Sequence, residues 1–390
     1  MLLLKTALRS LIGNGLKTWL NVFVLSFSFV LIIFMQGLLE GWNRQAVKDA
    51  VSWEIAGGQY WNQKYDPYDP FSIDSAAGVL PASLGNEYAS HQIEPVLIAQ
   101  GTLYPDGHMH AVLLKGIRPD QQLLALPTRL LNRKNVTDIP VIIGMNMAKQ
   151  TNLKVNDLVT LRWRDVNGTF EAVDIRVAGI FKTSVPTVDA GQIWLPLEQL
   201  RKMTLQPNAA TILIKSERIA CQKLKAWPFK DQTEMTKQTV ALVKAKTAGL
   251  TIFYFIFLML AMIAIFDTQT LSIFRRQREI GTFAALGMTQ SQLVGLFTLE
   301  GTMNAVLAIL LGTIYGLPLF IYYSVNGIGF GMDTSSFGIP MADKMYPVFT
   351  QNLIIGTILF IIIVTAVVSY LPARKIARMK PTDALRGKSL

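Results

Sequence analysis

The sequence predicts a membrane α-helical protein with four transmembrane helices and an α+β extracytoplasmic domain inserted between the first and second helices. Three observations support this fold class. Hydrophobic residues make up 51% of the 390 residues and charged residues only 16%, which is not the composition of an ordinary soluble domain. Several apolar runs reach the ~20 residues that a helix needs to cross the hydrocarbon core. A long middle stretch instead has the mixed composition of a folded soluble domain.

The first predicted span covers residues 19–41 and lies between Trp19 and Trp42. At about 1.5 Å per helical residue, these two tryptophans are separated by the distance between the two aromatic belts of a bilayer. The apolar run is too long for a cleaved signal peptide, and the sequence GLLEGWN offers no small-x-small cleavage site. We therefore expect an uncleaved anchor, with residues 1–18 as a cytoplasmic segment.

Residues 42–246 are predicted to form the extracytoplasmic domain, because short β-rich runs alternate there with turn residues. A hairpin is expected around Asp106-Gly107, a favoured turn pair, and a second turn at Asn167-Gly168. Together these patterns indicate an α+β domain with antiparallel or mixed pairing. The expected elements are strands over 93–104, 108–117, 141–144, 158–163 and 170–181, a strand leading into a helix over 192–203, and a polar helix over 231–246.

Three further spans are predicted in the second half of the chain. The Lys- and Arg-rich segments flanking them are expected inside, because positive residues are retained in the cytoplasm during insertion. Thr289 and Gln292 form a capping box at the start of the third span. The predicted order is span 247–274, cytoplasmic segment 275–292, span 293–325, external loop 326–351, span 352–371 and cytoplasmic tail 372–390.

The formal net charge of +11 is concentrated near the expected membrane surface. It is therefore a topology signal, and an attraction to membrane lipid, rather than a nucleic-acid-binding face. No nucleic-acid partner is expected.

The segment Arg275–Gly287, with the sequence RRQREIGTFAALG, lies between two predicted spans. Ile280, Phe283, Ala284 and Gly287 recur at the spacing of one helical face. A short amphipathic helix held between two spans is suited to pushing on a soluble partner. The alternative is an interfacial helix that only lies against lipid headgroups.

Two acids fall within the apolar runs. Asp267 and Glu300 are costly in hydrocarbon unless they face protein or water. Either both lie near the cytoplasmic surface, or Glu300 has a structural partner close to the segment after the second span.

Small residues form a stripe along the third span, at Gly301, Ala305, Gly312 and Gly316. Such stripes let helices approach closely, and both intrachain packing and contact with a second chain in a dimer are compatible with this one.

Catalytic and metal-binding patterns are not recognised in the sequence. The Walker A motif GxxxxGK[ST] is missing, since Thr382 stands where the first glycine would precede Gly387-Lys388-Ser389. His108 and His110 share one strand face without an apparent third ligand, so no metal site is expected. Cys221 is the single cysteine, which excludes a disulfide within the chain.

Several motifs resemble the permease signature of the FtsX/MacB/lipoprotein-release ABC transporter superfamily. They read Arg278-Glu279-Ile280-Gly281, Ala285-Leu286-Gly287, and Phe297 followed by Glu300-Gly301. The middle of the chain is similar to the periplasmic domain of that family at Ile143-Gly144, Asn156-Asp157 and Val177–Phe181 with Asp189. The resemblance covers nearly the whole chain, and the length and large external domain look most like lipoprotein-releasing subunits of the LolC/LolE type.

The resemblance implies that the segment after the second span is a coupling helix that docks on an ABC ATPase. The ATPase would be a separate subunit in two copies that binds ATP and Mg, so this chain would bind no cofactor and would not itself be an enzyme. By this resemblance the coupling residues are Arg275, Arg276, Arg278, Glu279, Ile280, Gly281, Phe283, Ala284 and Gly287.

The resemblance further implies a mechanotransmission permease in the bacterial inner membrane, with its large domain in the periplasm. Its partners would be a second permease subunit, the same or homologous, a lipoprotein substrate and a periplasmic carrier. One feature departs from that family: the short turn Arg164–Thr169 leaves no room for a carrier-docking hook. The alternatives are a MacB-like efflux permease for peptides or drugs, an FtsX-like regulator of cell-wall hydrolases, and a membrane-anchored enzyme, which the missing catalytic residues disfavour.

Overall fold

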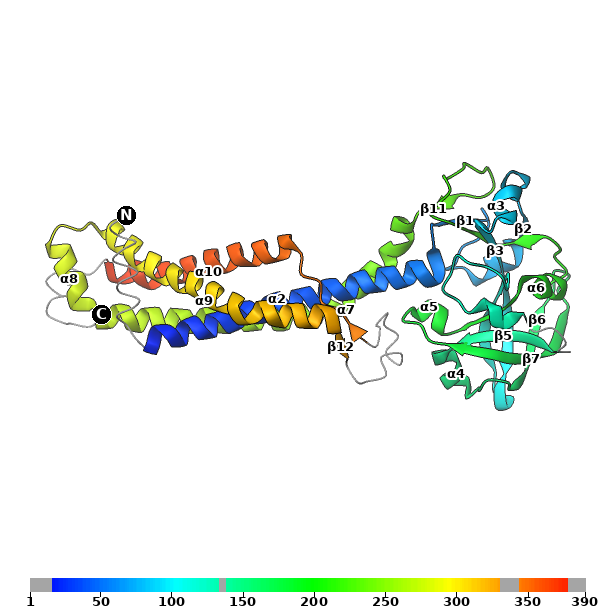
Figure 1. The fold of residues 1–390 in the computed structure, drawn as a ribbon, viewed down its shortest axis with the longest axis horizontal. Coiled ribbons are helices and arrows are strands. Elements are labelled where there is room, and N and C mark those ends of the chain that lie inside the picture. Colours follow the sequence, from blue (N-terminus) through cyan, green and yellow to red (C-terminus); the bar gives the residue numbers. More distant parts are fainter. Residues whose placement is uncertain (1–15, 133–137, 330–343, 378–390) are drawn as a thin grey trace. The chain divides into compact units, whose positions relative to one another are not determined.

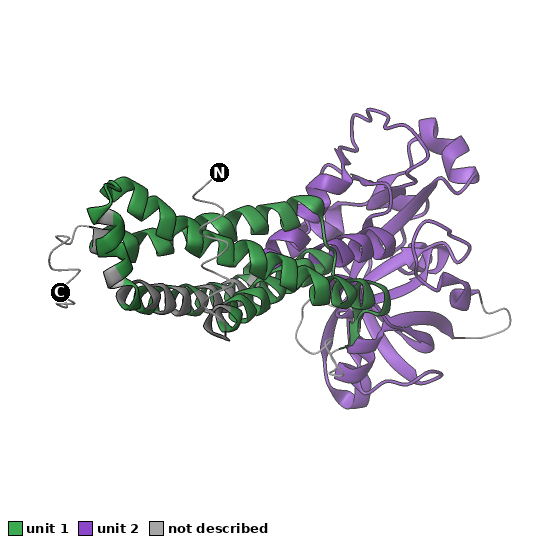
Figure 2. Cartoon of the chain, turned by 60° about the vertical axis from the view of Figure 1, so that its left-hand side comes forward, with its two compact units in different colours: residues 1–42, 245–329, 344–390 green, residues 43–244, 330–343 purple. Residues whose placement is uncertain are grey.

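The computed structural model describes residues 16–132, 138–329 and 344–377. The chain divides into two compact units (Figure 2), one made of residues 1–42, 245–329 and 344–390, the other of residues 43–244 and 330–343. The predicted N-terminal segment up to residue 15, most of the predicted external loop and the tail from residue 378 lie outside the described residues.

The first unit is helical (Figure 1). Three helical stretches of the described chain are long and apolar enough to cross a membrane: Val22–Ile55, Gln290–Asn326 and Gln351–Lys375. The span predicted over residues 247–274 lies in a helix whose side chains are described only in part, and it stays a prediction. The elements are α2 (Leu16–Ala50), α7 (Gln232–Arg275), α8 (Gln277–Ala285), α9 (Gln290–Asn326), α10 (Gln351–Ala377), β12 (Ile328–Gly329) and β13 (Lys344–Met345). Helices α2 and α7 have residues in both units.

The small-residue stripe of α9 packs against α2. A Cβ atom placed on Gly312 would lie 2.8 Å from Phe29 Cδ1, and one on Gly316 would lie 2.8 Å from Val30 Cγ2. Gly301 and Ala305 on the same face are also buried. Of the two readings of the stripe, the structure therefore shows intrachain packing, in which missing side chains let the two helices approach closely.

The second unit is built on a nine-stranded mixed sheet with the order β11-β1-β10-β3-β4-β8-β5-β7-β6 and an additional β3–β6 pairing. That extra pairing closes β3, β4, β8, β5, β7 and β6 into a ring. The nine strands of this sheet are β1 (Gln59–Trp61), β3 (Ile93–Tyr104), β4 (His110–Ile117), β5 (Ile139–Gly144), β6 (Leu158–Arg164), β7 (Phe170–Phe181), β8 (Gln192–Pro196), β10 (Ile212–Lys215) and β11 (Phe229–Lys230). Strands β2 (Gly78–Val79) and β9 (Ala209–Ala210) pair in a separate two-stranded sheet.

The interior of this ring is one hydrophobic core. Strand β6 alternates exposed and buried residues, and its buried residues Val159, Leu161 and Trp163 belong to that core together with Leu103 and Ile193. This period of two is what a strand with one buried face requires. Short helices connect the strands: α3 (Gly85–Ala89), α4 (Met145–Thr151), α5 (Pro186–Asp189) and α6 (Leu197–Met203).

The predicted elements of this unit are confirmed. Strands β3 and β4 pair antiparallel around Asp106 and Gly107, which both adopt the left-handed backbone of a hairpin turn. The order β5, α4, β6 appears as expected, β6 and β7 pair antiparallel across the Asn167-Gly168 turn, and β8 leads into α6. Pairing is mixed, since β4–β8 and β5–β7 are parallel.

A buried lysine ties the π-helical segment η1 (Val51–Ile55), which directly continues α2, to the sheet. Lys115 Nζ of β4 lies 3.6 Å from a carboxylate oxygen of Glu54 and 5.0 Å from the ring centre of Trp194. Burial lowers the pKa of Lys115, while the charge and hydrogen bond of Glu54 act in the opposite direction. Thr187 Oγ1 donates a hydrogen bond of 2.8 Å to the second Glu54 oxygen. Glu54 is therefore held from two elements.

Replacing Gly312 by leucine is expected to destabilise the helical unit by about 1–3 kcal/mol, because the new side chain would overpack the contact with Phe29. Gly356→Leu on α10 is the matched control, since a Cβ there meets no atom within 4 Å. Thermal unfolding of both variants in detergent checks the difference. Equal transition temperatures would contradict the close approach of α2 and α9.

Candidate functional site

Helix α8 is set between α7 and α9 by two well-defined helix ends (Figure 1). At its C-terminus, Gly287 has φ +95° and the Met288 N–H donates to the Phe283 carbonyl at 3.1 Å, as in a Schellman motif. Thr289 then caps α9: its backbone N–H donates to Gln292 Oε1 at 2.9 Å, and the predicted capping box is confirmed. The chain therefore turns from α8 into α9 within a few hydrogen-bonded residues.

The apolar face of α8 packs inside the helical unit. Ile280 is 4% exposed and clusters with Leu293 and Phe297 of α9 and Ala373 of α10. Phe283 packs against the edge of the same cluster. The side of α8 that remains open to a partner is therefore its polar side.

Arg276 joins the α7–α8 turn to the buried face of α9. Its Nη1 donates to both carboxylate oxygens of Glu300, at 3.1 and 2.8 Å, and its Nε donates to Glu279 at 2.7 Å. The guanidinium also lies 5.4 Å from the ring centre of Phe297. The Glu300 side chain is only 7% exposed, so this pair compensates a charge within the apolar run.

The electrostatic balance at Arg276 favours the ion pair. Burial alone would lower the pKa of Arg276, but hydrogen bonds and charges from Glu279 and Glu300 outweigh it and raise the pKa above its ordinary value. The guanidinium is therefore charged at every physiological pH, as Arg side chains are. Glu300 has the structural partner near α8 that the sequence suggested.

The predicted coupling residues divide into an exposed and a buried set. Arg275, Glu279 and Gly287 are exposed, whereas Ile280 and Gly281 are buried, Arg276 and Phe283 are half-buried, and the side chains of Arg278 and Ala284 lie outside the described residues. Asp267 on α7 is exposed.

Sequence reasoning missed Leu286 as a surface residue. It is 78% exposed just after α8, and the signal was available: Leu286 lies off the apolar face defined by Ile280, Phe283 and Gly287. Its neighbour Ala285 is also exposed. The site thus combines charged side chains with one protruding apolar side chain.

Metal binding has no support within the part of the chain that the structure describes. There, no three His, Cys, Asp or Glu side chains are grouped as a metal site requires.

Comparison with known families matches residues 251–381 to the FtsX-like permease C-terminal family. This region of the chain fits the FtsX/MacB superfamily of permeases. The matched region contains the second half of α7 and all of α8, α9 and α10, and therefore the whole Arg276–Glu300 site.

Curated relatives agree with this family. An uncharacterized ABC transporter permease of Methanocaldococcus jannaschii is 27% identical over 44% of this chain and 42% of its own length. The uncharacterized ABC transporter permease YknZ of Bacillus subtilis is 22% identical over 63% of this chain and 61% of its own. The macrolide export ATP-binding/permease protein MacB 2 of Aeromonas hydrophila is 32% identical over 32% of this chain and 17% of its own. All three matches cover less than two thirds of the relative.

Replacing Glu300 by glutamine is expected to destabilise the protein by about 3 kcal/mol, because the half-buried Arg276 loses the more buried of its two carboxylate partners. Glu279→Gln removes a carboxylate from the same arginine, but its side chain is 58% exposed, so its cost should stay below about 1 kcal/mol. Thermal unfolding of the two variants provides the comparison. A larger effect at Glu279 would show that the buried pair does not hold this corner.

Proposed function

We propose that this chain is the permease subunit of an ABC transporter and that α8 is the coupling helix on which a separate ATPase subunit docks. The observation that carries the proposal is the anchored α8 corner within the FtsX-like region. Two contacts fix α8 to α9. One is the ion pair of Arg276 with Glu300, and the other is the apolar packing of Ile280 against Leu293 and Phe297. A push on a helix held in this way moves the spans rather than the helix alone.

Helix α7 supplies the path from the coupling site to the extracytoplasmic domain. It runs without interruption through 44 residues, from Gln232 to Arg275, and at 1.5 Å per residue that is about 66 Å. In this mechanotransmission model, ATP-driven closure of two ATPase copies displaces α8, and α7 carries the displacement to the β-sheet unit. No solute pore is needed.

The docking surface is the exposed part of α8 and its C-terminal turn. Arg275 and Glu279 provide charges of both signs, and Leu286 provides the apolar contact that anchors an interface. Ile280 is not available to a partner, because it is buried within the chain.

The substrate class proposed is an acylated lipoprotein extracted from the bacterial inner membrane, with the domain on the periplasmic side and a second permease subunit completing the assembly. The support is the resemblance to lipoprotein-releasing subunits. Docking of a periplasmic carrier is assigned to another subunit, because the β6–β7 turn is tight: Asp165 Oδ1 accepts hydrogen bonds from the backbone N–H groups of Asn167 and Thr169.

Efflux is the second candidate function. It is favoured by relatives whose names describe macrolide export, among them the 26% identical MacB of Psychrobacter cryohalolentis. Proteoliposomes that contain the complete complex distinguish the two candidates: ATP-dependent release of a triacylated lipoprotein supports the first, and ATP-dependent accumulation of a macrolide supports the second.

Replacing Leu286 by aspartate should reduce the ATPase activity that co-purifies with the chain by roughly tenfold, because a charge would enter the docking contact. Val155→Asp, at an exposed apolar residue of the β-sheet unit, is the matched control and should retain full activity. Both proteins are affinity-purified from native membranes and assayed for ATP hydrolysis. If no ATPase activity co-purifies with the unmodified chain, the transporter proposal fails. If Leu286→Asp keeps full activity, only the docking surface is wrong.

A further inference from the structure

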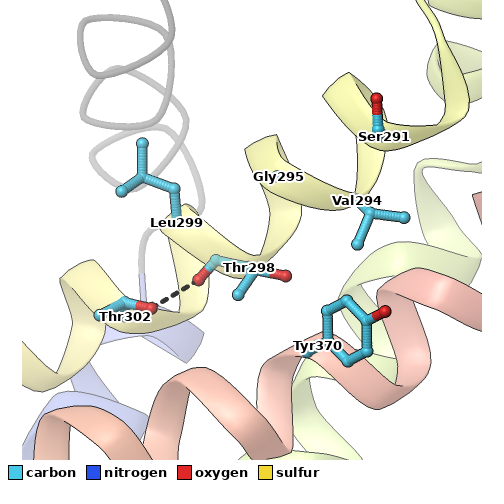
Figure 3. A pocket seen from close by; sticks show the side chains of 7 residues that line it. All are labelled: Ser291, Val294, Gly295, Thr298, Leu299, Thr302 and Tyr370. Carbon is cyan, nitrogen blue, oxygen red and sulfur yellow. Dashed lines mark hydrogen bonds between the residues drawn. The ribbon is translucent and has the colours of Figure 1, made fainter.

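A groove runs along the first turns of α9. It has a volume of about 460 Å³ and lies between the beginning of α9 and the end of α10. Figure 3 shows six of its residues following one another along α9, with the Tyr370 ring of α10 closing the other side. The lining residues are Ser291, Val294, Gly295, Thr298, Leu299, Thr302 and Tyr370.

The groove combines an apolar wall with an unsatisfied hydroxyl. Thr302 Oγ1 donates to the Thr298 carbonyl at 2.7 Å (Figure 3). The Thr298 hydroxyl, by contrast, is shielded from solvent and finds no hydrogen-bond partner among the described residues. Buried polar groups are normally hydrogen-bonded, since an unpaired one costs free energy. Thr298 is therefore an unpaired polar group beneath the wall of the groove.

A cationic side chain lies close to Tyr370, which lines the groove. The Arg374 guanidinium lies 6.0 Å from the ring centre of Tyr370, and Arg374 and Lys375 are the basic residues of the last turn of α10. Both helices that form the groove are candidate membrane spans, so the groove reaches from apolar surface to the level of basic side chains. Apolar side chains with a guanidinium close to Tyr370 match a lipid with a negatively charged headgroup.

We propose that this groove is a binding site for an anionic phospholipid. Arg374 pairs with the lipid phosphate, and the acyl chain lies along the apolar side chains of Val294 and Leu299. The site is separate from the Arg276–Glu300 corner, and the inference does not depend on which substrate is transported.

The test fills the groove without disturbing the fold. A Cβ on Gly295 meets no atom within 4 Å, so the side chain of Gly295→Leu would extend into open space and occupy the lipid site. Gly356→Leu, equally unobstructed on α10 but away from the groove, is the matched control. Native mass spectrometry of the full chain in detergent, with added phosphatidylglycerol or phosphatidylcholine, counts the lipids retained. Gly295→Leu should weaken phosphatidylglycerol retention by roughly tenfold, and Gly356→Leu should not change it.

The charge is tested separately. Arg374→Gln should reduce phosphatidylglycerol retention by roughly fivefold, and Lys375→Gln, which removes the same charge one residue later, should reduce it clearly less. Equal losses from these two variants, or equal retention of the two lipids by the unmodified chain, would overturn the proposal.

A second copy of the chain is the rival occupant. In a Cys221→Ser background, which removes the exposed free thiol, Gly295→Cys should stay monomeric under oxidation in membranes. Efficient disulfide cross-linking at position 295 would show that protein, not lipid, covers the groove.

Discussion

The pairing of Arg276 with Glu300 is the interaction on which the helical unit depends. A carboxylate within an apolar run requires a compensating charge, and Glu300 receives one from outside its own helix. Arg276 does so from the turn between α7 and α8 at 2.8 and 3.1 Å. The position of α8 follows from this requirement, because the turn that carries Arg276 also begins α8. Ile280 then contacts Leu293 and Phe297.

The same logic of compensated charge recurs in the β-sheet unit. Lys115 is buried in β4 and reaches Glu54 in the π-helical continuation of α2. A buried ion pair contributes little net stability, but removing one partner leaves an uncompensated charge. Both units thus attach a helix-terminal segment to their core by a charge pair rather than by apolar contact alone. A hydrogen-bonded charge pair restricts both the distance between two segments and their relative orientation. Such a restraint suits segments that are proposed to transmit motion.

Much of this architecture was accessible from local sequence patterns. The Asp106-Gly107 and Asn167-Gly168 turns and the Thr289 capping box are specified by neighbouring residues, so their prediction succeeded. The closure of the ring by the β3–β6 pairing could not be predicted from the sequence, because the alternation of apolar residues does not indicate which distant strands pair with each other. The small-residue stripe predicted close packing, but only the structure shows that α2 is its partner.

The candidate site shows the same division. The spacing of apolar residues identified the apolar face of α8 but not whether that face packs within the chain or against a partner. In the structure Ile280 packs within its own chain, and Leu286 is the exposed apolar side chain. The need of Glu300 for a partner was readable from the sequence. The identity of this partner could not be read from the sequence, because Arg276 lies 24 positions before Glu300.

Strand β3 belongs to both parts of the large sheet. Its first residues pair with β10, its last residues pair with β6 and close the ring, and β4 follows most of its length. Unfolding of β3 would break the hydrogen bonds of both parts at once. The β-sheet unit should therefore melt in a single cooperative transition, and a force applied at its edge strands is shared by the whole sheet instead of peeling one strand away.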